Sequence, residues 1–256
     1  IKNSIGVLGF LITILIFSIP IPKFTLNELS TLVFSGLLGI LIADLLFLDS
    51  LRRIGSGNSA LVSTIYTPSI FILAFFLFNE TISGQSYFGG ILVVTGIALT
   101  VYKIPKKIKR IDLYIGIIYG VLAQVFTAYA VLIVRPILDN HSILFIALYR
   151  FTAGLTASVI ICCVKSGIYS VLINYKNGFT NYHVLFGSFL GTYLSVILWL
   201  AGFKYTLAGR AAIYNQLSTV FIVIMARVFL KEPLNYRKVI GLGLAILGAI
   251  LVSIAK

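Results

Sequence analysis

The feature that most constrains this chain is a series of apolar stretches, each about as long as a bilayer is thick. A helix needs about 20 apolar residues to cross the hydrocarbon core, and short breaks with Pro, Gly or charged residues separate the stretches. Only 11% of the residues are charged, against about 25% in soluble domains. An all-α integral membrane protein is therefore predicted, with nine helices near residues 4–20, 33–51, 59–78, 86–102, 112–134, 144–165, 183–204, 210–230 and 237–255.

The net charge of +13 does not indicate nucleic-acid binding, because Lys and Arg lie between the apolar stretches. Cytoplasmic loops of membrane proteins carry such an excess of basic residues. When the loops are assigned to alternate sides, 14 Lys and Arg fall on one side and six on the other. This bias predicts that the loop at Lys103–Arg110 is cytoplasmic and that the C-terminus lies outside.

An internal repeat organises the helices. Residues 34–100 align without a gap to residues 186–252 at a constant offset of 152, with 16 of 67 positions identical. Apolar composition alone would match Leu and Ile by chance, but it would not align one Glu and several Gly in a single register. Duplication of an ancestral unit explains the pattern.

The repeat divides the chain into a first half at 1–102, a basic linker at 103–111 and a second half at 112–256. The first half has no counterpart to residues 112–152, so we expect roughly 40 residues, including one helix, to be missing upstream. The complete protein would have ten helices, five per half, of which nine are present here. An odd number per half places the two halves in opposite orientations, as in the inverted repeats of many carriers.

In both halves a helix ends in an acidic turn that precedes a glycine-spaced helix. The first copy reads Phe76–Ile82 and the second Phe229–Leu234, followed by Gly89 and Gly96 or by Gly241 and Gly248. This pattern resembles the EamA domain of the drug/metabolite transporter superfamily, and the resemblance covers the whole chain. It implies a ten-helix carrier of inverted repeats that moves small metabolites or drugs, often outward.

The chain departs from this family pattern at three points. The first helix is absent, the Pro of the second copy is replaced by Val220, and the charge bias opposes the cytoplasmic C-terminus that is usual in the family.

A structural role is predicted for the residues that both halves share. Glu80 and Glu232 lie where a helix ends, so each carboxylate can stay in interfacial water or accept hydrogen bonds from the free amides of the next helix. Gly89 and Gly96, like Gly241 and Gly248, lie seven residues apart on one helix face. Such glycines allow close helix packing, within one subunit or between two subunits of a homodimer.

Asp44 is the acidic residue that lies deepest in a predicted helix, eleven residues from Val33. A bare carboxylate at that depth costs about 2.5–3.5 kcal/mol, so Asp44 should be protonated, paired or hydrated. It could couple transport to protons, contact a cation in the cavity, or make a buried structural hydrogen bond.

Other polar residues are candidates for the wall of a central cavity. Ser188, Thr192, Ser195 and Trp199 share one face at α-helical spacing. Membrane-embedded amides and hydroxyls either bind substrate or hydrogen-bond between helices, and both alternatives remain open here. The further candidates are Tyr66, Gln124, Thr127, Asn215 and Gln216.

Arg150, near the start of its helix, is expected to reach the interface by snorkelling, with anion binding as the alternative. The shortage of deep cations argues against multiply anionic substrates.

These features predict a secondary carrier in a cell membrane, the prokaryotic inner or plasma membrane, that binds a small-molecule substrate and lies in the lipid bilayer. No cofactor, metal site or catalytic residue is expected, and no phosphate-binding loop indicates direct use of ATP. A receptor or scaffold without transport is the alternative. An intramembrane enzyme would need clustered His, Asp, Glu or Ser at depth, and the sequence does not provide such a cluster.

Overall fold

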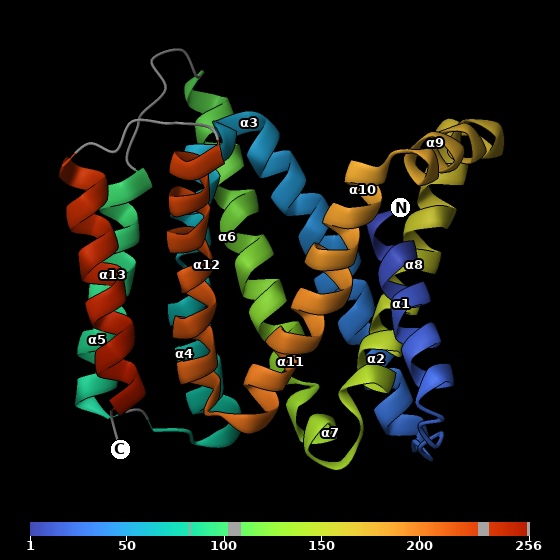
Figure 1. Ribbon diagram of the computed structural model, residues 1–256, viewed down its shortest axis with the longest axis horizontal. Helices are drawn as coiled ribbons and strands as arrows, with labels where there is room; N and C mark the ends of the chain where they lie inside the picture. Colours follow the sequence, from blue (N-terminus) through green and yellow to red (C-terminus); the bar gives the residue numbers. More distant parts are fainter. Residues whose placement is uncertain (82, 102–108, 230–235, 255–256) are drawn as a thin grey trace. The chain divides into compact units, whose positions relative to one another are not determined.

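The computed structural model describes residues 1–81, 83–101, 109–229 and 236–254, and the regular structure in these ranges is helical. Figure 1 traces it from the N-terminus in blue to the C-terminus in red. The elements are α1 (Lys2–Ile16), α2 (Leu26–Gly36), the π-helix η1 (Leu37–Ile42), α3 (Ala43–Ser63), α4 (Tyr66–Phe78), α5 (Gly84–Val101), α6 (Arg110–Leu132), α7 (Arg135–Asn140), α8 (Ile143–Ser166), α9 (Ile168–Thr180), α10 (Tyr182–Ser188), the π-helix η2 (Phe189–Leu194), α11 (Ser195–Tyr205), α12 (Ala208–Phe229) and α13 (Tyr236–Ile254).

The chain forms two compact units, each of which is described by itself. Unit 1 comprises Ile1–Asp44 and Ile133–Tyr205, and unit 2 comprises Leu45–Leu132 and Thr206–Lys256. Each unit therefore takes segments from both halves of the repeat. A core of aromatic and aliphatic side chains fills unit 1, where the rings of Phe10 and Phe151 meet edge to face at 5.6 Å. In unit 2, Val93, Ile97, Ile213 and Val252 form a buried cluster.

Several helices are long and apolar enough to cross a membrane. Among the described residues these segments are Leu26–Gly55, Arg110–Asn140, Ile143–Ser166 and Tyr182–Tyr205, and shorter apolar helices cover Lys2–Ile16, Tyr66–Phe78, Gly84–Leu99 and Val239–Val252. Large apolar side chains such as Val164 and Leu198 are exposed, as expected of a surface in contact with lipid. The prediction of an all-α integral membrane protein is confirmed.

The second predicted helix begins earlier than expected, at Leu26 instead of residue 33. Thr25 and Glu28 form a capping box in which Glu28 Oε2 accepts from the Thr25 amide at 2.7 Å. The helical segment is thereby extended by two turns towards its N-terminus. Asp44 lies 18 residues beyond Leu26, about 27 Å at 1.5 Å per residue, and the apolar segment Leu26–Gly55 continues for eleven residues beyond it.

The helix predicted at 59–78 is broken. α3 ends at Ser63 and α4 begins at Tyr66, because Pro68 has no amide hydrogen and its ring clashes with the carbonyl of Thr64. The matching segment of the second half has Val220 at the position of Pro68 and forms the continuous helix α12. A single substitution between the halves thus explains one broken and one unbroken helix.

The helix α9 was not predicted. Its 13 residues are too few to cross a bilayer, and most of their side chains are exposed. Gly167 separates α9 from α8 with a φ of +77°, a conformation that glycine adopts without steric cost. The sequence prediction relied on apolar stretches of about 20 residues, so it did not include a helix of this length.

The helices α5 and α13 pack closely through the repeated glycines. A Cβ atom at Gly89 would lie 2.7 Å from the carbonyl oxygen of Gly248, and one at Gly96 would clash with the carbonyl oxygen of Gly241. These four glycines therefore allow backbone-to-backbone contact between the last helices of the two halves. Their shared face is occupied within the chain.

Candidate functional site

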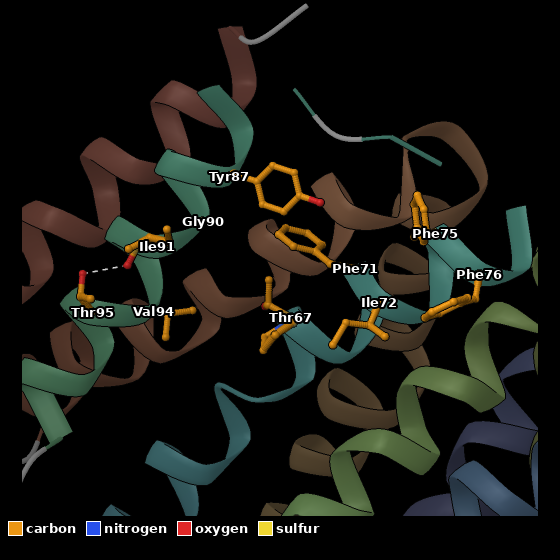
Figure 2. Close-up of a pocket in the computed structure, with 11 residues that line it drawn as sticks. Thr67, Phe71, Ile72, Phe75, Phe76, Tyr87, Gly90, Ile91, Val94 and Thr95 are labelled. Atoms are coloured by element: carbon orange, nitrogen blue, oxygen red, sulfur yellow. Dashed lines mark hydrogen bonds between the residues drawn. The ribbon is translucent and has the colours of Figure 1, made fainter. Parts of the chain in front are cut away.

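A groove of about 600 Å³ lies between α4 and α5 in unit 2 (Figure 2). The lining residues lie on one face of each helix, since those of α5 follow the i, i+3, i+4, i+7, i+8 spacing. None of them is charged. They are Thr67, Pro68, Phe71, Ile72, Phe75 and Phe76 from α4, and Tyr87, Gly90, Ile91, Val94 and Thr95 from α5.

Two aromatic rings face each other in this groove. Phe71 and Tyr87 point toward one another in Figure 2, with ring centroids 5.5 Å apart and an interplanar angle of 82°. This edge-to-face geometry is favourable for aromatic pairs. The hydroxyl of Thr95 donates to the carbonyl of Ile91 in its own helix at 2.8 Å. The groove thus offers a mainly apolar, aromatic surface.

The sequence reasoning sought polar cavity residues and therefore missed the groove. Tyr66 precedes the lining residue Thr67 by one position but is not among the lining residues. The helical spacing on α5 and the dense Phe residues of α4 are the signals that could have revealed it. Residues that face lipid produce the same pattern, however, so sequence alone does not separate a groove from an ordinary lipid-facing surface.

Two of the predicted cavity residues meet at Ser63 in unit 2. The side-chain amide of Gln124 donates to Ser63 Oγ at 3.4 Å, and that of Gln216 donates to the Ser63 carbonyl at 3.3 Å. Ser63 is the last residue of α3, where backbone carbonyls lack partners within the helix. The two glutamines therefore join α6 and α12 to the end of α3. This arrangement favours interhelical hydrogen bonding over substrate contact for these amides.

The other candidates in unit 2 lie apart from this cluster. Tyr66 is buried in the first turn of α4. The hydroxyl of Thr127 donates to the carbonyl of Ala123 in its own helix at 2.8 Å. Asn215 is exposed on α12. A role in substrate binding stays a prediction for all three.

Asp44 forms an ion pair in unit 1. Its Oδ2 lies 2.6 Å from Lys2 Nζ, and the two side chains are 34% and 57% exposed. Of the three states expected for this carboxylate, the structure shows the paired one. The pair connects the start of α1 to the start of α3.

The predicted polar face at 188–199 is divided by the π-helix η2. Ser188 and Thr192 are buried, whereas Ser195 is exposed and Trp199 is half-buried. The Thr192 side chain packs against Gly6 of α1. A π-helix holds more residues per turn than an α-helix, so α-helical spacing does not keep these four side chains on one face.

Arg150 does not snorkel, and that expectation is wrong. Its side chain is fully buried in unit 1, seven residues into α8 and so about 10 Å from the start of that helix. The guanidinium carbon lies 5.7 Å from the ring centroid of Trp199, within the range of a cation–π interaction. A cation is therefore buried among the helices of unit 1, which removes the argument against anionic substrates. The sequence position gave no information on which face of α8 turns inward.

Glu80, one of the two acidic residues that the halves share, makes a hydrogen bond to a helix N-terminus. Glu80 Oε1 accepts a hydrogen bond from the amide of Gly209 at 3.3 Å. Gly209 lies in the first turn of α12, where amides lack helical partners and favour a carboxylate. The expected capping interaction is thus made with α12 instead of the following helix. Glu232 and most of the basic linker at 103–111 lie outside the described residues.

The membrane-spanning helices, the halves related by a constant offset and the apolar groove define a multi-pass helical membrane protein of the kind that carries small solutes. The chain belongs to the EamA-like transporter family, whose model matches residues 2–102 and 114–254. The family resemblance predicted from the sequence is confirmed. The protein is a membrane transporter and not an enzyme.

Known relatives agree with this assignment. The uncharacterized transporter YetK of Bacillus subtilis (strain 168) is 24% identical over 240 residues, which cover 92% of this chain and 71% of the relative. An uncharacterized transporter of Archaeoglobus fulgidus is 23% identical over 222 residues, or 86% and 74% of the two chains. A solved structure described as "Crystal structure of protein" aligns with a TM-score of 0.77 at 12% identity, over 99% of this chain and 86% of that one, and supports the fold alone.

Proposed function

We propose that this protein is a secondary transporter that exports small, largely apolar metabolites or drugs across the plasma membrane by alternating access. The observation that carries the substrate class is the groove between α4 and α5. Its volume of about 600 Å³ falls in the range of pockets that hold drug-sized molecules. Its aromatic lining suits a hydrophobic or aromatic group, because the hydroxyls of Thr67 and Thr95 already donate to the carbonyls of Ala212 and Ile91.

Alternating access is supported by the duplicated sequence. Carriers built from inverted repeats rock one bundle against another around a fixed site, and each unit of this chain contains segments of both halves. Export is the direction that the family resemblance implies. The alternative of a receptor or scaffold differs in one respect that can be measured, because it would bind a ligand without moving it.

The groove predicts a difference between two phenylalanines of unit 2. Phe71 lines the groove, whereas Phe88 is exposed on α5 outside the lining. Phe71→Ala is expected to raise the substrate concentration for half-maximal transport roughly ten-fold, since burying a Phe side chain contributes about 1.5–3 kcal/mol. Phe88→Ala serves as the matched control and should leave this concentration unchanged. Transport rates measured over a concentration series in proteoliposomes provide the comparison.

Because Phe71 also packs against the buried core of unit 2, a second variant separates binding from stability. Ile91 lines the groove and is 59% exposed, so Ile91→Trp should fill the groove without disturbing the core. Transport is expected to fall while the melting temperature stays within a few degrees of wild type. Equal transport by wild type, Phe71→Ala and Ile91→Trp would rule out the groove as the substrate site.

The ion pair of Asp44 supports proton coupling as a further part of the proposal. Protonation of the Asp44 carboxylate would release Lys2, so a proton could be exchanged for a change in the contact between α1 and α3. Asp44→Asn is therefore expected to remove the response of transport to an imposed pH gradient. Asp49→Asn changes another carboxylate of α3 and should preserve that response. A pH response that is unchanged in Asp44→Asn would exclude Asp44 as the coupling group.

A further inference from the structure

Two π-helices interrupt membrane-spanning segments at matching places in the repeat. η1 covers Leu37–Ile42 and η2 covers Phe189–Leu194, and their first and last residues differ by the repeat offset of 152. The hydrogen bonds match as well, because the Ala43 amide donates to the Leu38 carbonyl and the Ser195 amide donates to the Leu190 carbonyl. Each bond spans five residues, which defines a π-helical turn. The third residue of each π-helix is glycine.

The packing of the two π-helices is matched too. Ile40 of η1 lies against Gly154 of α8, and its repeat partner Thr192 of η2 lies against Gly6 of α1. Ideal Cβ atoms at these glycines would approach the Ile40 and Thr192 side chains to 2.7 and 2.9 Å. The helices α1 and α8 themselves overlap at the repeat offset. The same π-helical position in each half therefore packs on a glycine of a helix from the other half.

A π-turn accommodates one more residue than an α-turn, so its conversion to α-helix changes the register of the residues after it. The change for one residue is about 100° of rotation and 1.5 Å of rise. Asp44 lies two residues beyond η1, and Ser195 is the residue directly after η2. The passage of the chain from unit 1 to unit 2 also comes soon after η1, between Asp44 and Leu45. A register change at either π-helix would redirect candidate site residues.

We propose that η1 and η2 are a pair of hinges whose interconversion between π-helix and α-helix accompanies the transport cycle. This inference rests on the proposed alternating access. Mid-helix π-turns are rare and occur often at functional sites, and here the same rare turn occurs at one position in both halves. The hinges act on α3 and α11, the segments that begin where the π-helices end.

Two glycines of unit 1 provide the test. Gly191 lies inside η2 and Gly187 lies in α10, and a Cβ atom at either position would meet nothing within 4 Å. Gly191→Ala therefore stiffens the hinge without a clash, and Gly187→Ala makes the same chemical change outside it. Gly191→Ala is expected to slow transport roughly five-fold, the factor by which alanine exceeds glycine in helix propensity. Gly187→Ala should leave transport at the wild-type rate.

Amide hydrogen exchange supplies a readout that does not require transport. The amides of 189–195 are expected to exchange faster in wild type than those of α10 and α11, and roughly five-fold more slowly in Gly191→Ala than in wild type. If wild type moves no solute, the proposed function fails, while slowed exchange in Gly191→Ala still supports the hinge. If Gly191→Ala and Gly187→Ala have the same exchange at 189–195, the hinge is overturned whatever the transport rates are.

Discussion

Gly96→Ala is expected to destabilise the protein by about 1–3 kcal/mol, the usual cost of inserting a methyl group into a closely packed interface. A Cβ atom at this position would clash with the carbonyl oxygen of Gly241 and lie 2.7 Å from the Ala245 amide nitrogen. Both neighbours are backbone atoms of α13, so the helices must move apart to relieve the contact. The midpoint of thermal unfolding in detergent micelles measures the effect.

The matched control for this substitution lies on the same pair of helices. Gly243 of α13 has nothing within 4 Å of an ideal Cβ position, so Gly243→Ala should leave the midpoint unchanged or raise it slightly through helix propensity. If Gly96→Ala and Gly243→Ala unfold at the same temperature, the close contact between α5 and α13 does not contribute to stability.

The second large effect is expected at Arg150. Arg150→Ala removes a fully buried side chain from unit 1, and truncations of that size cost about 2–5 kcal/mol through the cavity that they leave. Arg150→Met keeps most of the volume and loses the cation that faces Trp199. Loss of the cation–π contribution alone costs about 0.5–2 kcal/mol, and Arg150→Met should be less destabilising than Arg150→Ala because it leaves a smaller cavity.

Arg110 supplies the control for Arg150. Its side chain is exposed at the start of α6, so Arg110→Ala should change the free energy of unfolding by less than about 0.5 kcal/mol. The order expected from denaturation is Arg150→Ala least stable, then Arg150→Met, with Arg110→Ala close to wild type. Equal stability of Arg150→Ala and Arg110→Ala would contradict the burial of Arg150.

Much of the fold could be predicted because membrane helices follow a strong length rule. Each of the nine predicted stretches contains helix in the structure, and the repeat offset correctly relates η1 to η2 and α5 to α13. The start of α2 was missed because a capping box at Thr25 and Glu28 depends on local polar residues and not on hydropathy. The break before α4 depends on one proline, whose effect a window of 20 residues averages out.

The candidate site was harder to predict. Polar residues in a membrane sequence stand out, but the sequence does not indicate whether they face a neighbouring helix, as Gln124 and Gln216 do at Ser63. The π-helix at 189–194 changed which side chains share a face, and the burial of Arg150 depended on the rotation of α8 about its axis. Apolar grooves have no polar signal at all, so the lining around Phe71 became visible only with both helices in place.

Substrate counterflow in proteoliposomes tests the central claim most directly. Vesicles that contain the protein are loaded with an unlabelled solute from a panel of aromatic and apolar metabolites. The same solute is then added outside in labelled form. A carrier that alternates access should accumulate label transiently above equilibrium for at least one solute, and Phe71→Ala should weaken that accumulation while Phe88→Ala does not. Binding of a solute from the panel can be measured separately as a rise in the melting temperature of the folded protein. If a solute binds but gives no counterflow, that result contradicts the account and favours a receptor.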